Sequence, residues 1–161
     1  MSSFYQNNGA AYRQFFYDSN GSVFYVASFY MPRIDIFNLT CSFIRSIDIG
    51  GNQLFGLSYF NGKLSAGTYG SNKFYFLTNG LITNTFILKQ CSVTPWQSIS
   101  LTFDSFGNLA VSCLSDNLIL IYDFNGKYLT SMSTSDLPFT TGIDSAGRFV
   151  VMNRYSLDIY Y

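Results

Sequence analysis

The sequence of 161 residues predicts an all-β fold built from a repeated unit, and three observations support this prediction. The pattern Asp-Ser-x-Gly occurs at 18–21, 104–107 and 144–147, each time before an apolar run, with a weaker copy at 59–62. The final glycines of these segments, at positions 21, 62, 107 and 147, are 41, 45 and 40 residues apart. No segment shows the 3.6-residue period of a helix, whereas Gly and Asn recur at intervals of about 8–12 residues. A period of about 40–50 residues with several strands per unit is typical of β-propeller blades.

The repeat predicts a single propeller domain over residues 1–161, with about four blades: three complete and a fourth incomplete. The approximate blade boundaries are 11–50, 54–92, 97–134 and 139–161. In each blade the first two strands are joined by a turn in which Asp or Asn bonds nearby backbone and Gly tolerates positive φ. The strands expected are 14–17, 22–27, 33–37 and 42–47; 54–60, 63–68, 73–77 and 84–89; 98–103, 108–113, 118–122 and 128–132; and 140–143, 149–153 and 157–160.

Closure of the ring is the open question, because the fourth blade has only three predicted strands. Residues 3–6 could pair beside 157–161 as the missing strand and close a small ring. The favoured alternative is a fragment of a six-bladed ring, or half of a dimeric one. Either alternative leaves 157–161 as an exposed apolar edge, which natural proteins avoid, and so predicts self-association through an open edge strand.

Composition narrows the class of partner. Nine basic and nine acidic residues give a net charge of zero, and no run of like charges occurs. Nucleic-acid binding usually needs a basic patch, so we do not expect it. Charged residues make up 11% of the chain and aromatic residues 19%. Polarity therefore comes from neutral Ser, Asn and Tyr groups, a composition that suits adaptable protein contacts.

The sequence does not determine the cellular compartment of the protein. Residues 1–8 lack the basic and apolar segments of a signal peptide, and no apolar stretch of about 18 residues predicts a membrane span. Two N-glycosylation sequons begin at Asn20 and Asn38 and hint weakly at an extracellular location. Asn20 also precedes Gly21, the pairing that a hairpin turn favours.

The three cysteines, Cys41, Cys91 and Cys113, cannot all pair within the chain, and their spacing fits no zinc motif. Cys113 lies in a strand-like run, so we expect it to pack as a small hydrophobic residue. Cys41 and Cys91 fall near predicted loops and could form a disulfide.

Blade three carries a family resemblance. Residues 104–111 (DSFGNLAV) followed by 116–127 (DNLILIYDFNGK) resemble an NHL-type propeller repeat, whose pattern is D-x-x-G-N-[hydrophobic]-x-V followed by N-x-R-I-x-[hydrophobic]-[aromatic]-D-x-x-G. Residues 26–28 with 32–37 match it too, and 156–160 are similar to its third strand. The resemblance covers nearly the whole chain, although blade two diverges and the family's usual Asn-His is absent. It implies a propeller fold and leaves the subfamily open.

The chain contains no histidine and no glutamate. This removes the most common general base, the most common metal ligand and any Ser-His-Asp triad. The histidine-dependent lyases and glutamate-dependent lactonases found on related propellers are therefore poor matches. We predict no catalytic residues and no cofactor.

Three aspartates nevertheless recur at matching blade positions: Asp18, Asp104 and Asp144. Matching positions in a propeller lie in a ring, so these carboxylates could bind a cation such as Ca²⁺. The alternative function is then a carboxylate- and divalent-cation-dependent hydrolase or lyase. The favoured interpretation is that each aspartate caps its own turn.

Four further residues are candidates for binding. Arg33, Lys73 and Arg154 precede the third strands of their blades and could place three cations on one face. Trp96 lies in the loop between blades two and three, where it would anchor a partner if exposed, although packing between blades is the more common arrangement. The predicted function is a non-catalytic interaction module with a protein- or ligand-binding loop face.

Overall fold

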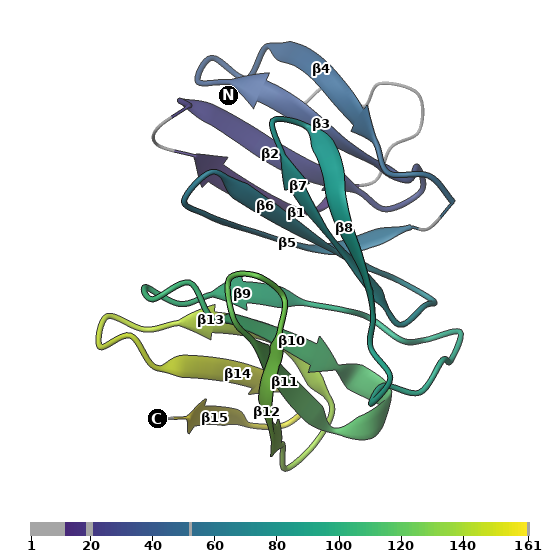
Figure 1. The fold of residues 1–161 in the computed structure, drawn as a ribbon, viewed down its shortest axis with the longest axis vertical. Helices are drawn as coiled ribbons and strands as arrows, with labels where there is room; N and C mark the ends of the chain where they lie inside the picture. The colour runs from purple at the N-terminus through teal and green to yellow at the C-terminus, as the bar shows by residue number, and fades with distance from the viewer. Residues whose placement is uncertain (1–11, 19–20, 52, 161) are drawn as a thin grey trace.

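A computed structural model describes residues 12–18, 21–51 and 53–160 of the chain (Figure 1). This part contains fifteen β-strands and one short 3-10 helix, η1 (Leu114–Asp116). The strands form four small antiparallel sheets, arranged in a ring as a four-blade β-propeller. The all-β propeller prediction is therefore confirmed.

Each blade is an up-and-down meander in which neighbouring strands of the chain are hydrogen-bonded neighbours in the sheet. Blade 1 contains β1 (Tyr12–Asp18), β2 (Val23–Ser28), β3 (Arg33–Asn38) and β4 (Phe43–Asp48). Blade 2 contains β5 (Leu54–Phe60), β6 (Lys63–Thr68), β7 (Lys73–Thr78) and β8 (Leu81–Ile87). Blade 3 contains β9 (Leu101–Phe103), β10 (Leu109–Cys113), β11 (Leu118–Tyr122) and β12 (Tyr128–Ser133). Blade 4 contains β13 (Pro138–Ile143), β14 (Phe149–Asn153) and β15 (Leu157–Tyr160).

The first hairpin differs between blades 1 and 2. Phe60 pairs with Lys63, so Asn61 and Gly62 form a two-residue loop with φ of 45° and 82°, the positive pair that a type I′ turn requires. In blade 1, Asp18 pairs with Val23, which makes the loop two residues longer. The residue just before β2 is thus Ser22, and the predicted equivalence of Gly21 with Gly62 is off by one position.

The core consists of contacts between successive blades. Side chains alternate between the two faces of a strand, and we call the face that packs on the next blade the leading face and the opposite one the trailing face. Blades 1 and 2 share a cluster of Ala27, Ile34, Ile36, Ile47 and Ile49 with Leu54, Leu57, Leu64, Ala66, Tyr75 and Leu77. Blades 2 and 3 share Phe74, Phe76, Leu88, Cys91, Ile99, Leu101, Phe103, Leu109, Val111, Cys113, Leu120 and Tyr122. Blades 3 and 4 share Ala110, Ile119, Ile121 and Val151, with Met132, Phe149 and Tyr160 at the margin.

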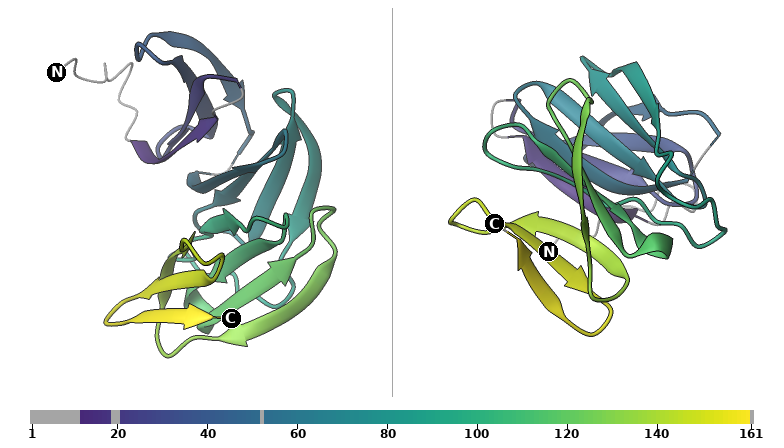
Figure 2. Two further views of the ribbon diagram at one scale, coloured as in Figure 1. Left: turned by 90° about the vertical axis from the view of Figure 1, so that its left-hand side faces the viewer. Right: turned by 60° about the horizontal axis from the view of Figure 1, so that its bottom comes forward.

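Blades 1 and 4 are the first and the last of the four sheets along the chain (Figure 2). No hydrophobic cluster joins blade 4 to blade 1 in the part of the chain that the structure describes. The predicted latch at 3–6 lies outside the described residues. Within those residues, no helix is long and apolar enough to cross a membrane.

The disulfide differs from the prediction. Cys91, in the connection after blade 2, is bonded to Cys113 at the end of β10, and Cys41 is not disulfide-bonded. The suggested Cys41–Cys91 pair was therefore wrong. Cys113 is fully buried in the blade 2–3 cluster as expected, but as half of a disulfide. The reason is tertiary, because the connection between blades folds back across the end of β10.

Glycine allows two inner strands to approach the next blade. A Cβ on Gly56 would lie 2.5 Å from the carbonyl oxygen of Ile99, and a Cβ on Gly67 would meet the same oxygen more closely still. The obstacle is backbone, which cannot rotate away as a side chain can.

We therefore expect Gly67→Ala to destabilise the protein by at least about 1–3 kcal/mol, the usual cost of overpacking. Urea unfolding monitored by far-UV circular dichroism measures the loss. Gly142→Ala is the matched control, since Gly142 is also in a strand and a Cβ added there would meet nothing within 4 Å. Equal stability of the two variants would contradict the close approach at Ile99.

Candidate binding face

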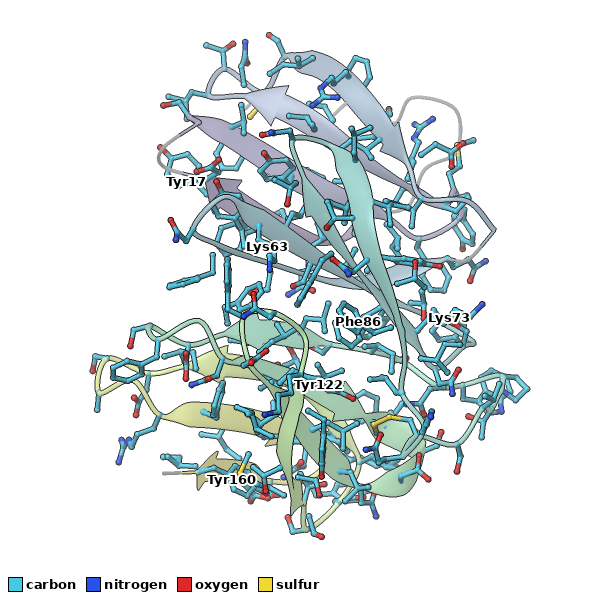
Figure 3. The ribbon with its side chains drawn as sticks, in the orientation of Figure 1. Tyr17, Lys63, Lys73, Phe86, Tyr122 and Tyr160 are labelled. Atoms are coloured by element: carbon cyan, nitrogen blue, oxygen red, sulfur yellow. A yellow bond between two sulfur atoms is a disulfide. The ribbon has the colours of Figure 1, made fainter. Side chains whose placement is uncertain are left out.

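The propeller has two faces, one at each end of its strands, and the two faces carry different loops. One end, the hairpin face, carries the turns at 61–62, 79–80, 104–108, 123–127 and 144–148. The other end, the Trp96 face, carries the loops at 29–32, 69–72, 114–117 and 154–156 and the connection at 88–100. Figure 3 shows Tyr17 and Lys63 toward the hairpin face and Lys73 toward the Trp96 face.

Hydrogen bonds fasten the connection at 88–100 to the neighbouring loop of blade 3. The carboxylate of Asp116 accepts bonds from the backbone N–H and the hydroxyl of Ser92, at 2.7 and 2.6 Å. The hydroxyls of Thr94 and Ser115 lie 2.7 Å apart. Together with the disulfide, these contacts hold the part of the connection that precedes its tip against blade 3.

Trp96 lies at this tip and is 72% exposed. The expectation that it packs between blades was wrong. Its neighbour Gln97 is fully buried and accepts a 3.0 Å hydrogen bond from the Ser115 N–H. Gln97 anchors the loop toward the interior while the adjacent indole projects outward, so a large apolar side chain is held on a fastened loop.

A row of aromatic rings crosses the same face from blade 1 to blade 2. Tyr30, Phe29, Tyr69 and Phe55 follow one another with ring centroids 5.3, 5.1 and 6.4 Å apart. Tyr30 is 63% exposed at the outer end. Phe55 lies at the inner end and lines a central cavity. Edge-to-face and offset ring contacts of this kind are worth about 0.5–1.5 kcal/mol each beyond the area that they bury.

The central cavity has a volume of about 270 Å³ and is bordered by all four blades. Its lining residues are Gln14, Phe55, Ser100, Phe139, Thr140 and Met152. Gln14 is fixed because its side-chain oxygen accepts a 2.8 Å bond from the Leu57 N–H. The lining combines three apolar side chains with three neutral polar ones and carries no charged group.

The three predicted cations lie at the same end of the ring on three different blades, but each has its own surroundings. The Nε of Arg33 is 3.0 Å from the buried carboxylate of Asp35. The guanidinium of Arg154 lies 4.9 Å from the ring centroid of Tyr155. Lys73 is half-buried at the start of β7. Each of these charges therefore has its own local surroundings on a separate blade.

Two of the three predicted aspartates are held by their own turns. Asp104 Oδ1 accepts backbone N–H bonds from Phe106 and Asn108 at 2.9 and 2.7 Å. Asp144 Oδ1 accepts the corresponding bonds from Ala146 and Arg148 at 2.9 and 3.0 Å.

Asp18 has a different environment, because it is buried beside two tyrosines of blades 1 and 2. Burial and, next, the Asp18 carboxylate raise the pKa of Tyr59. Among the described residues, no three carboxylate or thiol side chains lie close enough together to form a metal site. The structure therefore does not gather Asp18, Asp104 and Asp144 into one group.

The structure describes one of the two predicted N-glycosylation sites. Asn20 lies outside the described residues. Asn38 ends β3, and its side-chain oxygen accepts bonds from the Thr40 N–H and hydroxyl and from the Ser42 N–H. Asn38 thus organises the β3–β4 turn, and its modification stays a prediction.

Sequence reasoning missed the aromatic row and the central cavity. One local signal was available: aromatic residues follow β2 and β6 directly, at Phe29 and Tyr69. The cavity has no local signal, because its lining comes from four separate blades.

Comparisons with known proteins show the fold alone. No family model and no curated protein matches the chain. A hydrazine synthase chain from Kuenenia stuttgartiensis is similar in structure, with a TM-score of 0.73 and 14% identity over 96% of this chain and 49% of that one. This chain thus spans about half the length of that protein. The computationally designed Ika4 protein is also similar, with a TM-score of 0.71 and 14% identity over 97% of this chain and 94% of that one.

If the role of Asp104 is to cap its own turn, Asp104→Ala should lower the free energy of unfolding by about 1–3 kcal/mol, because two backbone donors lose their acceptor. Asp123→Ala is the matched control. Asp123 accepts the same two backbone bonds, from Asn125 and Lys127, but is half-buried where Asp104 is only 7% exposed. We expect Asp123→Ala to lower the free energy of unfolding by less than Asp104→Ala does. We also expect millimolar Ca²⁺ to leave the Tm of the unsubstituted protein unchanged. A Ca²⁺-dependent rise in Tm that Asp104→Ala abolishes would restore the cation hypothesis.

The second prediction from the turns concerns acid. Hydrogen bonds from the Arg148 side chain, and then from its backbone, hold the pKa of Asp144 below its usual 3.8. A lowered pKa contributes stability above the unfolded-state pKa, and this contribution is lost as pH falls through the folded-state value. We therefore expect Arg148→Gln to be less stable at pH 7 and to lose less on acidification from pH 5 to pH 2. Denaturant unfolding from pH 5 to pH 2 measures the free energy of unfolding of each variant, with Arg154→Gln as the control. If the free energies of Arg148→Gln and of the unsubstituted protein fell in parallel with pH, the role of Arg148 would be contradicted.

Proposed function

We propose that this protein is a non-catalytic interaction module that binds a partner protein through its Trp96 face. The observation that carries this proposal is the exposed Trp96 on a fastened loop. Tyr30 and Tyr155 are also prominent on this face, at 63% and 79% exposed. Tryptophan and tyrosine are the residues most enriched at binding hot spots, because they bury a large area at low entropic cost.

The scaffold supports this use of the face. Each blade is held by its neighbours, so the loops project from a rigid frame, and rigid positioning lowers the entropic cost of binding. Neutral hydroxyl and amide groups dominate between the aromatic residues, for example Ser71, Asn72 and Thr94. Such groups form hydrogen bonds without the desolvation cost of charges.

We also propose that the repeat is of the NHL type. Support comes from blade 3, where the residues that resemble the family occupy corresponding structural roles. Asp104 and Asp123 each cap a turn that ends in glycine, at Gly107 and Gly126. The stretch between them contains β10 and β11 as an antiparallel pair.

The test is a comparison of partner capture by variants of the two faces. Crosslinking and affinity capture from the native source should recover a protein with the unsubstituted chain and lose it with Trp96→Ala. Phe106→Ala is the matched control, since Phe106 is an 85% exposed aromatic residue on the hairpin face. Capture that is equal for both variants, or lost equally in both, would rule out the Trp96 face as the binding surface.

A further inference from the structure

One position of the innermost strand supplies polar side chains to the central cavity. In blades 1, 2 and 4 the strand pairing gives this position to Gln14, Gly56 and Thr140. In blade 3 it belongs to Ser100, whose carbonyl oxygen accepts a 3.0 Å hydrogen bond from the N–H of Ser112. The three side chains at this position all line the cavity, and none of them is charged. The repeat therefore brings neutral hydrogen-bonding groups from three blades to one place.

Two aromatic rings border the cavity beside these polar groups. The pairing of β5 with β6 skips Phe55, and the pairing of β13 with β14 skips Phe139, so both residues lie at β-bulges. A bulge changes the direction in which its side chain points, and both of these rings line the cavity. Blade 2 has no side chain at the polar position, because a Cβ on Gly56 would lie 2.5 Å from the carbonyl oxygen of Ile99. Its contribution to the cavity is the ring of Phe55.

The side-chain amide of Gln14 has a fixed orientation. A backbone N–H can only donate, so the 2.8 Å hydrogen bond with the Leu57 N–H must end on the amide oxygen of Gln14. The amide nitrogen then carries two N–H groups that are not used in this bond. Among the described residues, no group accepts a hydrogen bond from this nitrogen. Gln14 therefore offers two donors at the wall of the cavity.

A third donor comes from Thr140. The hydroxyl oxygen of Ser100 accepts a 3.3 Å hydrogen bond from the Thr141 N–H and lies 3.3 Å from the hydroxyl oxygen of Thr140. Ser100 is only 1% exposed, so its hydroxyl group is confined to these two partners. Donation from Ser100 to Thr140 satisfies the buried hydroxyl and leaves the proton of the half-buried Thr140 hydroxyl for a ligand. The cavity thus presents donors from two blades and no charge.

We propose that the central cavity binds a small uncharged carbonyl compound with a flat apolar body, such as an aromatic amide. The carbonyl oxygen accepts hydrogen bonds from the Gln14 amide and the Thr140 hydroxyl, and the flat body packs on Phe55 and Phe139. A charged ligand fits poorly, because no residue of the lining carries a charge that would offset its desolvation. A volume of about 270 Å³ lies below the range of about 300–1,000 Å³ that drug-sized ligands occupy, so the ligand is small. This site does not use Trp96, so its test is independent of the proposed partner protein.

Titration of the full chain with benzamide, followed by two-dimensional amide NMR, tests the proposal. The signals of the cavity residues should shift and saturate with a Kd on the order of 1 mM, which suits a ligand of so few atoms. Benzoate has the same ring but a negative charge, and toluene has the ring without a carbonyl group. Each should bind at least about tenfold more weakly than benzamide, because benzoate loses hydration without gaining a cation and toluene leaves the donors unpaired.

Gln14→Glu is the sharpest variant, because its carboxylate still accepts the bond from the Leu57 N–H but has no N–H for the ligand. It should weaken benzamide binding at least about tenfold. Gln90→Glu is the matched control, since Gln90 is exposed and lies outside the lining, and its variant should bind benzamide as the unsubstituted protein does.

Thr140→Val removes the second donor at nearly constant shape and should weaken benzamide binding severalfold. It also keeps the test valid if Gln14→Glu does not fold, which circular dichroism would reveal. Shifts that do not saturate by about 20 mM benzamide would overturn the proposal. It would equally be overturned if benzoate or toluene bound as tightly as benzamide, or if every folded cavity variant bound benzamide as tightly as Gln90→Glu does.

Discussion

A sheet of three or four short strands cannot bury both of its faces by itself, so every blade of this protein depends on the blade beside it. The contact of one leading face with the next trailing face recurs three times, and each contact has its own apolar cluster. Fully burying a Leu, Ile or Phe side chain is worth about 1.5–3 kcal/mol, so these clusters are the main source of stability. The glycines opposite Ile99 allow the inner strands to come close enough to form one of them.

Because each blade depends on its neighbours, strand residues and loop residues have different roles. Strand residues are committed to the contacts between blades, whereas loop residues at the two ends of the ring are not. On the hairpin face the loops are short and use their polar groups internally, as Asp104 does. On the Trp96 face the connection at 88–100 is longer, and hydrogen bonds and a disulfide fasten it. This second arrangement leaves Trp96 exposed on a fastened loop, whereas the exposed Phe106 of the hairpin face lies in a short turn that Asp104 holds.

The dependence of each blade on its neighbours also bears on the apolar strand residues of blades 1 and 4. An apolar side chain at Leu157 has a clear role in a blade that is followed by another blade, and so has Phe15 in a blade that is preceded by one. In this structure Leu157 is 62% exposed and Phe15 is 69% exposed. The loop residues of the Trp96 face and these strand residues belong to separate parts of the molecule.

Local patterns in the sequence determined the repeat, the all-β class and the turn chemistry, because alternation, glycine and aspartate act over a few residues. The same patterns predicted that Asp104 and Asp144 cap their own turns. Only the tertiary structure decided that Cys91 pairs with Cys113, that Trp96 is exposed and that four blades border one cavity. Each of these outcomes depends on how far apart two blades lie in space, and no local pattern of residues encodes that distance.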